Sequence, residues 1–504
     1  MSKSSETGTT YSQFACIGSG FSAIALGASL QRWYGITDVR FFERHSDLGG
    51  TWFANQYPGC ACDVPSLLYS LSFAPNPAWK KSLATADELW QYIDKVADDY
   101  NLRPKMVFRA TVEKCQWIEE SHRWRLFVRD GNTGKVFVHE SQFLYAGSGI
   151  LVHPQKADIQ GIDSFNGPVF HSSQWRHDVD LTDKNVALVA LDRSPLDIPN
   201  NKFIQALYRN LPGFQAFVRL AAFLVMENEI RAFFMTSDGA SFREDRRKKA
   251  EAYMKSQAPE KYHDLLIPEF EIGCKRRIFD SGYLKGLDAD NVTLTDDRIV
   301  EVLPDGVRTD NGFTKADVIV LANGFETNSF CTNIEIIGRG GVTAEEHWKE
   351  HGGSEAYNST SIHGFPNFFL MLGPNTATGH SSTLMAAENA INYSLRLIKP
   401  ILQGKATAVD VKKDAEDEYV EQIQRDLQKT VFFSGCNSWY NKPADTTRRR
   451  RGVLSTIFRG FLWSGAFAAT GGILLTGRNK GWDFDKYLPI LREQIYHLQR
   501  TVKF

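Results

Sequence analysis

The pattern of apolar and polar positions predicts a strand, a turn and a helix near the start of the chain. Residues 14–17 are apolar, and a glycine-rich turn over 18–20 leads into a segment of helical periodicity that begins near Phe21. A second apolar run, 39–42, follows at a distance that suits a helix crossing between two parallel strands. The pattern therefore predicts a βαβ unit of a doubly wound, Rossmann-type α/β sheet.

The residues of the turn indicate what this unit binds. Gly18 permits a tight turn, Gly20 lets the backbone approach a pyrophosphate, and Ala23 is small enough for close packing of helix and strand. The pyrophosphate would lie at the positive N-terminus of the helix. Glu43 stands 25 residues after Gly18, at the end of the second strand, where it can accept hydrogen bonds from ribose hydroxyls. An ordinary strand-helix turn would explain the glycines but not the position of Glu43, so we predict a dinucleotide site.

A second unit of this kind is incomplete. Residues 186–190 are apolar and predict another buried strand, but residues 191–195, of sequence LDRSP, stand where a glycine turn should follow. A complete strand, turn, helix and return strand needs about thirty residues. The chain therefore has one clear dinucleotide site and a truncated second one.

Composition limits the remaining possibilities. The 504 residues carry a net charge of -1, which allows two or three domains and gives no electrostatic case for nucleic acid. Cys60 and Cys62 are too close together for a zinc site and have no histidine cluster beside them, so no metal site is predicted. The seven scattered cysteines and the polar first ten residues predict a cytoplasmic protein without structural disulfides.

One apolar stretch leaves the relation to membranes open. Residues 453–476 are rich in Gly and Ala and follow four arginines at 448–451. Arg459 and several glycines weaken this stretch as a spanning helix, so a buried pair of glycine-rich segments is favoured. Membrane contact through 453–476 remains the alternative.

Several further motifs resemble those of the Baeyer–Villiger monooxygenases. Residues 43–52, which contain Gly50, Thr51 and Trp52, together with residues 57–63, resemble the flavin-site segment of that family. The family fingerprint FxGxxxHxxxW is matched at all four fixed positions, by Phe165, Gly167, His171 and Trp175. Additional matches lie at 273–277, 317–326 and 364–382, so the resemblance extends from about residue 14 to residue 440.

The resemblance implies a division of the chain into four parts. They are a first part of an FAD-binding domain (1–150), a linker (151–176), a truncated NADPH-binding domain with a helical region (177–320), and a second part of the FAD domain with a C-terminal extension (321–504). Within the third part, residues 204–234 have mostly helical spacing of apolar positions and predict a long apolar helical region, either a plain core helix or a lid over the substrate.

The resemblance also implies an activity. FAD reduced by NADPH would use molecular oxygen to convert a ketone into an ester or lactone, while the protein supplies position and electrostatics. Arg276 resembles the arginine that stabilises the anionic oxygen on the flavin, and Asp63 resembles the acid that pairs with it. Tyr69 belongs to the expected cofactor-binding set, Arg193 resembles an arginine near the NADPH 2′-phosphate, and His171 resembles a linker residue that organises domain motion.

Each of these residues also has a structural interpretation. Arg276 lies in a basic run that could be a solvated face, and Asp63 could cap a turn. Phe165 and Trp175 could be core aromatics of the linker, and His171 a structural histidine. The chain also departs from the family pattern, with Ala61 where an arginine is usual.

The missing second turn leaves three explanations. A segment could be missing from this sequence, the flavin could be reduced without tight NADPH binding, or oxygenation could have been lost.

From the family resemblance, we expect a monooxygenase that acts on an apolar ketone of moderate size in the biosynthesis of a secondary metabolite. The alternatives are an FAD-binding oxidase or isomerase, or a catalytically silent flavoprotein.

Overall fold

The computed structural model describes residues 9–190, 200–278, 280, 282–327, 330–331, 333–376, 379–435 and 502–503. Within them, the βαβ unit predicted at the N-terminus is confirmed. It consists of β1 (Thr10–Ile17), α1 (Phe21–Tyr34) and β2 (Val39–Phe42), and the two strands pair in parallel. The first ten residues of α1 are all buried, because the helix packs between the sheet and α10 (Thr383–Leu397).

The first and last parts of the sequence share one large sheet. Its order is β13-β4-β5-β6-β1-β2-β3, and β14 also pairs with β6. β4 (Ala110–Ile118), β5 (Arg123–Asp130) and β6 (Val136–Ala146) form an antiparallel meander, whereas the pairs around β1 are parallel. Because β13 (Glu335–Ile337) and β14 (Phe368–Leu370) return to the sheet that begins with β1, the residues between β6 and β13 form an insertion.

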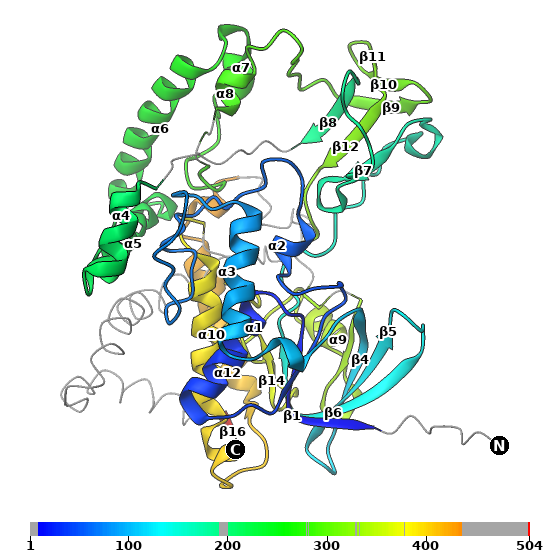
Figure 1. The fold of residues 1–504 in the computed structure, drawn as a ribbon, viewed down its shortest axis with the longest axis vertical. Helices are drawn as coiled ribbons and strands as arrows, with labels where there is room; N and C mark the ends of the chain where they lie inside the picture. The colour runs from blue at the N-terminus through cyan, green and yellow to red at the C-terminus, as the bar shows by residue number, and fades with distance from the viewer. Residues whose placement is uncertain are drawn as a thin grey trace.

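The insertion contains a smaller parallel sheet, shown at the top of Figure 1. Its order is β7-β12-β8, with β7 (Val169–His171), β8 (Val186–Ala190) and β12 (Val318–Ala322). The strand predicted at 186–190 is therefore confirmed at both ends, but the expectation that it is buried is wrong, because β8 is an edge strand in which Val186 is 40% and Leu188 62% exposed. An antiparallel sheet of β9 (Ile299–Leu303), β10 (Gly306–Thr309) and β11 (Phe313–Lys315) packs beside it through Val302, Val307 and Ile319.

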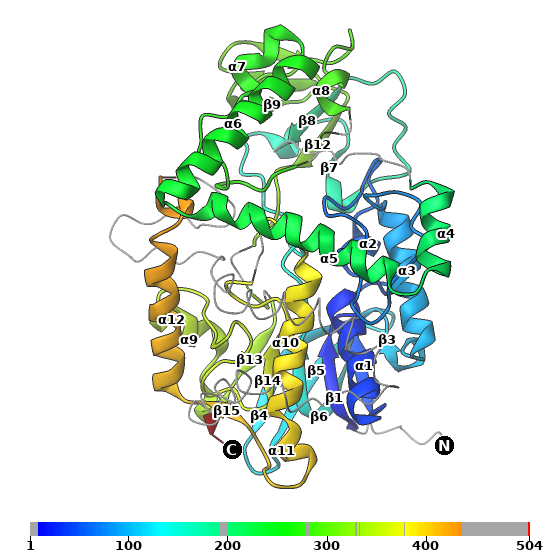
Figure 2. The same cartoon turned by 90° about the vertical axis from the view of Figure 1, so that its left-hand side faces the viewer.

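The helical region expected over 204–234 is present but interrupted. α4 (Lys202–Asn210) ends before Pro212, and α5 (Phe214–Glu227) begins after Gly213, whose φ is 80°. Proline lacks an amide hydrogen and glycine readily adopts a positive φ, so the pair breaks the helix. Arg219 of α5 donates hydrogen bonds to the carbonyl oxygens of Leu67 and Ser70, which fastens α5 to the first part of the chain (Figure 2).

The described residues form further helices and strands. They are α2 (Thr51–Ala54), α3 (Ala86–Asp99), β3 (Met106–Val107), α6 (Ser237–Gln257), α7 (His263–Leu266), α8 (Tyr283–Gly286), α9 (Ala344–Glu350), α11 (Lys399–Leu402), β15 (Asp410–Val411), α12 (Lys413–Leu427) and β16 (Val502–Lys503), with short 3₁₀ helices at η1 (Arg103–Lys105), η2 (Ile162–Ser164), η3 (Ser172–Gln174), η4 (Asn228–Phe233), η5 (Glu260–Tyr262), η6 (Arg339–Gly341) and η7 (Val431–Phe433). The predicted α/β class, a Rossmann-type domain with an inserted second unit and a helical segment, is confirmed.

The expectations about disulfides and about membrane contact have different outcomes. Cys274 is disulfide-bonded, so the prediction of a chain without disulfides is wrong; the other five described cysteines are free and buried. No helix among the described residues is long and apolar enough to cross a membrane. Residues 453–476, for which membrane contact was an alternative, lie outside the described residues, as does Arg193.

Candidate active site

The glycine turn after β1 forms a cradle of bare backbone. Gly18 has a φ of 95°, and a Cβ atom there would lie 2.7 Å from the carbonyl oxygen of Gly147, so only glycine fits. Gly20 precedes α1 in an extended conformation, and a Cβ on Gly20 would lie 3.5 Å from the Cα of Gly50. Ala23 is fully buried in the first turn of α1. Two glycine turns therefore face each other at the helix N-terminus, where an anion is favoured.

Glu43 closes one side of this cradle. Its carboxylate is 4% exposed, and Oε2 accepts hydrogen bonds from the backbone amide of Ser19 at 2.9 Å and from its hydroxyl at 3.0 Å. Oε1 accepts the amide hydrogen of His45 at 2.9 Å. These bonds hold the carboxylate beside the glycine turn, and Oε1, which accepts a single hydrogen bond, retains capacity to accept a further hydroxyl donor. The geometry thus suits the ribose-binding role expected for Glu43.

Residues 49–52, of sequence GGTW, line the side of the cradle opposite Glu43. Gly49 and Gly50 have φ values of 119° and 54°, and α2 begins directly afterwards at the half-buried Thr51. Trp52 donates a hydrogen bond from Nε1 to the hydroxyl oxygen of Tyr69 at 3.1 Å, and the two rings meet edge to face at 5.6 Å. Burial raises the pKa of Tyr69, so its hydroxyl remains a neutral hydrogen-bonding group. Of the residues expected to bind the cofactor, Trp52 and Tyr69 therefore form one aromatic wall.

Asp63 and Arg276 meet although they lie 213 positions apart in the sequence. The Nε of Arg276 donates to Oδ2 of Asp63, and its Nη2 donates to Oδ1 at 3.2 Å, so both carboxylate oxygens accept from one guanidinium. The two side chains are 12% and 31% exposed. The neighbouring Arg277 is half exposed and pairs with Glu229 at 3.3 Å. The alternative interpretation of this basic run as a solvated face therefore applies to Arg277, which is half exposed, but not to Arg276, which is largely buried.

His171, one of the fingerprint residues, contacts the segment through which the chain leaves the insertion. His171 is 5% exposed, donates from Nε2 to the carbonyl oxygen of Gly324 at 3.1 Å, and accepts the amide hydrogen of Ser173 at Nδ1. Its ring packs edge to face on Phe325 at 5.3 Å. Residues 153–155 and 324–326 run side by side, with hydrogen bonds of 2.9 Å. His171 thus lies where the chain enters and leaves the insertion.

The other fingerprint residues have packing roles in the same region. A Cβ on Gly167 would lie 2.2 Å from the carbonyl oxygen of Asp317, directly before β12, so no larger residue fits. Trp175 meets Phe170 edge to face at 5.3 Å, and Phe165 packs beside Val302 and Ile319. These contacts agree with core aromatics that anchor the linker.

Arg193, the residue expected near the NADPH 2′-phosphate, lies outside the described residues. β8 ends at Ala190, the next described residue is Asn200, and α4 begins at Lys202. Within the described part of the insertion, no glycine-rich turn leads from β8 into a helix.

One contact was not anticipated from the sequence. His380 lies with its Nε2 3.2 Å from Oε1 of Glu227, so the end of α5 contacts the loop before α10. The loop belongs to the matched segment 364–382, and Ser382 caps α10 by accepting the amide hydrogen of Leu384. No sequence spacing relates Glu227 to His380, because the two residues are 153 positions apart.

Comparisons with known proteins agree with this arrangement. The family model of an NAD(P)-binding Rossmann-like domain matches residues 16–86. A Baeyer–Villiger monooxygenase of Streptomyces coelicolor is 34% identical over 458 residues, which covers 84% of this chain and 86% of its own. An FAD-binding monooxygenase of Aspergillus terreus is 30% identical, with 85% and 83% covered. A solved structure of an oxidized steroid monooxygenase bound to NADP superposes with a TM-score of 0.75 at 24% identity, over 92% of this chain and 98% of its own.

The Rossmann-type fold and the facing glycine turns, together with these relatives, define a flavin-dependent monooxygenase. Within that class, the chain belongs to the Baeyer–Villiger monooxygenase family.

Proposed function

We propose that this protein binds FAD, takes reducing equivalents from NADPH, and inserts one atom of molecular oxygen beside the carbonyl of an apolar ketone. The observation that carries the proposal is the Arg276–Asp63 pair, which brings a buried cation from the insertion to the flavin-site segment. Bound FAD would supply the oxygen-activating chemistry. The guanidinium would stabilise negative charge that develops on oxygen, and Asp63 would hold it in place.

The residues of the cradle suit the dinucleotide part of FAD. Gly18, Gly20 and the N-terminus of α1 would bind the pyrophosphate, and Glu43 would bind the ribose hydroxyls. A Cβ at Gly20 or Gly50 would fill the space between the two turns, which supports a ligand that needs bare backbone on both sides. Trp52 and Tyr69 would border the flavin end.

The nature of the ketone is a further part of the proposal. α5 is predominantly apolar and lies across the loop that contains Leu67 and Ser70, which supports an apolar substrate of moderate size. Such a substrate would suit the biosynthesis of a secondary metabolite, and we propose a cytoplasmic location for the enzyme.

A second candidate function rests on the residues after β8. The sequence LDRSP contains no glycine, so a pyrophosphate site like that of the first turn is not encoded there. An FAD-binding oxidase or isomerase that no longer uses NADPH would be consistent with this loss.

An oxygen-labelling assay tests the proposed reaction. The purified protein is supplied with FAD, NADPH, isotopically labelled O₂ and a panel of cyclic, linear and aryl ketones, and products are analysed by mass spectrometry. We expect an ester or lactone that carries one labelled oxygen atom. Release of hydrogen peroxide without any labelled ester across the panel would contradict the proposal and favour an oxidase.

Gly20→Ala should remove FAD without unfolding the protein. The new Cβ would meet backbone atoms of Gly49 and Gly50 at ordinary distances of 3.5–4.0 Å, so the protein accommodates it, but the methyl group would occupy space where we propose that the pyrophosphate binds. We expect FAD affinity to fall by at least about tenfold, which is about 1.4 kcal/mol. Flavin absorbance after gel filtration and the circular dichroism spectrum measure the two effects.

Gly35→Ala is the matched control. Gly35 ends α1 with a φ of 68°, and no atom lies within 4 Å of the position that its new methyl group would take. The substitution should therefore cost about 1 kcal/mol of stability and leave FAD bound. Equal FAD retention in both variants would show that the cradle does not bind the pyrophosphate.

A further inference from the structure

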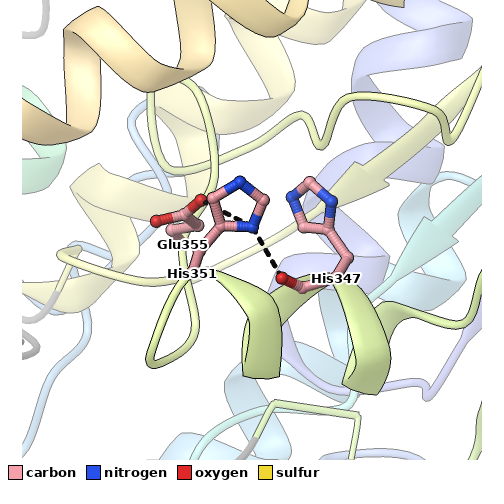
Figure 3. Close-up of side chains that lie close together, drawn as sticks. All are labelled: His347, His351 and Glu355. Atoms are coloured by element: carbon pink, nitrogen blue, oxygen red, sulfur yellow. Dashed lines mark hydrogen bonds and ion pairs between the residues drawn. The ribbon is translucent and has the colours of Figure 1, made fainter.

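His347 on α9 and His351 directly after it lie near two buried carboxylates, on the side of the molecule away from α1 and α2 (Figure 2). His347 and His351 lie one helical turn apart, Glu355 follows in the next loop, and Glu416 comes from the first turns of α12. Figure 3 shows the side chains of His347, His351 and Glu355 gathered at the end of α9. His347 is 7% exposed, Glu355 2% and Glu416 1%. Nothing in the proposed flavin chemistry uses these groups.

The ligand-type atoms of the cluster converge. One such atom from each of His347, His351 and Glu355 lies within 4.8 Å of the other two. Nε2 of His347 lies 3.3 Å from Oε2 of Glu416, yet it makes no hydrogen bond with any described residue. The other oxygen of Glu416, Oε1, also has no hydrogen-bond partner among the described residues. A buried nitrogen and a buried carboxylate oxygen without hydrogen bonds are rare in native proteins and indicate an additional partner.

His351 lies beside Glu355, with its Nδ1 3.5 Å from Oε1 of that carboxylate. Nδ1 lies 2.7 Å from the backbone oxygen of His347, which can only accept, so Nδ1 carries a proton. Nε2 lies 3.4 Å from the ammonium group of Lys413 and 3.8 Å from Oδ1 of Asp417. Lys413 is itself paired with Asp417 at 3.1 Å.

The charges of the cluster then favour a divalent cation. Two carboxylates that are almost fully buried need compensating positive charge. Each carboxylate has one imidazole beside it, His347 at 3.3 Å from Glu416 and His351 at 3.5 Å from Glu355. A divalent ion between these groups would supply two positive charges at once.

We propose that His347, His351, Glu355 and Glu416 bind one divalent transition-metal ion, with zinc as the best match. Imidazole nitrogens and carboxylate oxygens in a set of four are typical of tetrahedral zinc. Ligand atoms about 2 Å from zinc lie within about 4 Å of one another, so the ligand atoms of His347, His351 and Glu355, which lie within 4.8 Å of one another, need to move by only about 1 Å. With four protein ligands the ion has a structural role, in which it fastens the end of α9 to the start of α12.

This site runs against the expectation of no metal site, which considered only Cys60 and Cys62. The spacing of His347 and His351 at i and i+4 was the available sequence signal. Glu416, 65 residues later than His351, joins them only because α12 packs against α9 in the folded chain.

Metal analysis of the full-length, untagged protein tests the proposal. The protein is stripped with EDTA, incubated with zinc chloride and desalted, and its zinc is measured by mass spectrometry. We expect about one zinc ion per chain. Replacement of zinc by Co²⁺ should give the visible absorption of a tetrahedral cobalt site. His347→Asn and Glu416→Gln should weaken zinc binding by at least about tenfold in competition with a chromophoric chelator.

Matched controls lie on exposed positions. His177→Asn and Glu345→Gln remove the same chemical groups outside the cluster and should retain the zinc. Less than about a tenth of a zinc ion per wild-type chain would overturn the proposal and leave a network of histidine–carboxylate ion pairs. Unchanged zinc content in His347→Asn would also overturn it. If that variant does not fold, the melting temperature decides: zinc should raise it in the wild type but not in Glu355→Gln, and no rise in the wild type would refute the site.

Discussion

Arg276→Ala should lower the rate of ester formation by about 10²–10³-fold while FAD remains bound. The guanidinium is largely buried and held by both oxygens of Asp63, so it presents a fixed positive charge that needs no reorganisation during the reaction. The Gly20 cradle and Glu43 are unaffected by this substitution. Product formation at saturating ketone measures the first effect, and flavin absorbance measures the second.

Two comparison variants separate charge from geometry. Arg277→Ala removes the adjacent arginine, which is half exposed and paired with Glu229, and should leave ester formation near the wild-type rate. Arg276→Lys keeps the charge but cannot donate to both oxygens of Asp63, so an intermediate rate is expected. Wild-type turnover in Arg276→Ala would remove this residue from the proposed chemistry.

Anaerobic mixing with NADPH should bleach the bound FAD, but with half-saturation only at millimolar concentrations. The second unit lacks an encoded glycine turn after β8, so the pyrophosphate of NADPH loses a set of backbone donors and a helix N-terminus. A loss of about 3–4 kcal/mol weakens binding by about 10²–10³-fold. Stopped-flow absorbance of the flavin at increasing NADPH concentrations gives the affinity.

Dithionite is the control for this experiment, because it reduces any accessible flavin without a binding site. Bleaching by dithionite but not by millimolar NADPH would contradict NADPH-driven oxygenation and favour the oxidase or isomerase. Sequencing the transcript across residues 189–195 gives an independent answer. A longer transcript with a further glycine turn and helix would predict micromolar affinity instead.

The local elements of the fold were accessible from the sequence. The strands at 39–42 and 186–190 were predicted with their observed ends, because short apolar runs bounded by polar residues are typical of strands. The glycine turn was equally accessible, since Gly18 has a backbone conformation and a close approach that no other residue tolerates. The helical region expected over 204–234 is present, but the sequence pattern did not show where Pro212 and Gly213 divide it into separate helices.

Long-range pairs were not accessible in the same way. The approach of Arg276 to Asp63 was expected only through the family resemblance, and no spacing relates Glu227 to His380 or Glu416 to His347. Nor did any local pattern require β13 and β14 to rejoin the sheet that starts with β1.

The sequence by itself determined the glycine turn, the strands around it, the fingerprint and the loss after β8. Each of these depends on the conformational limits and burial of a few neighbouring residues, which are present wherever the chain goes. Only the tertiary structure decided that Arg276 is buried on Asp63 while Arg277 faces solvent, and that His347 on α9 meets the carboxylate of Glu416. Such contacts depend on the path of the whole chain, because distant side chains meet only after the elements that carry them have packed.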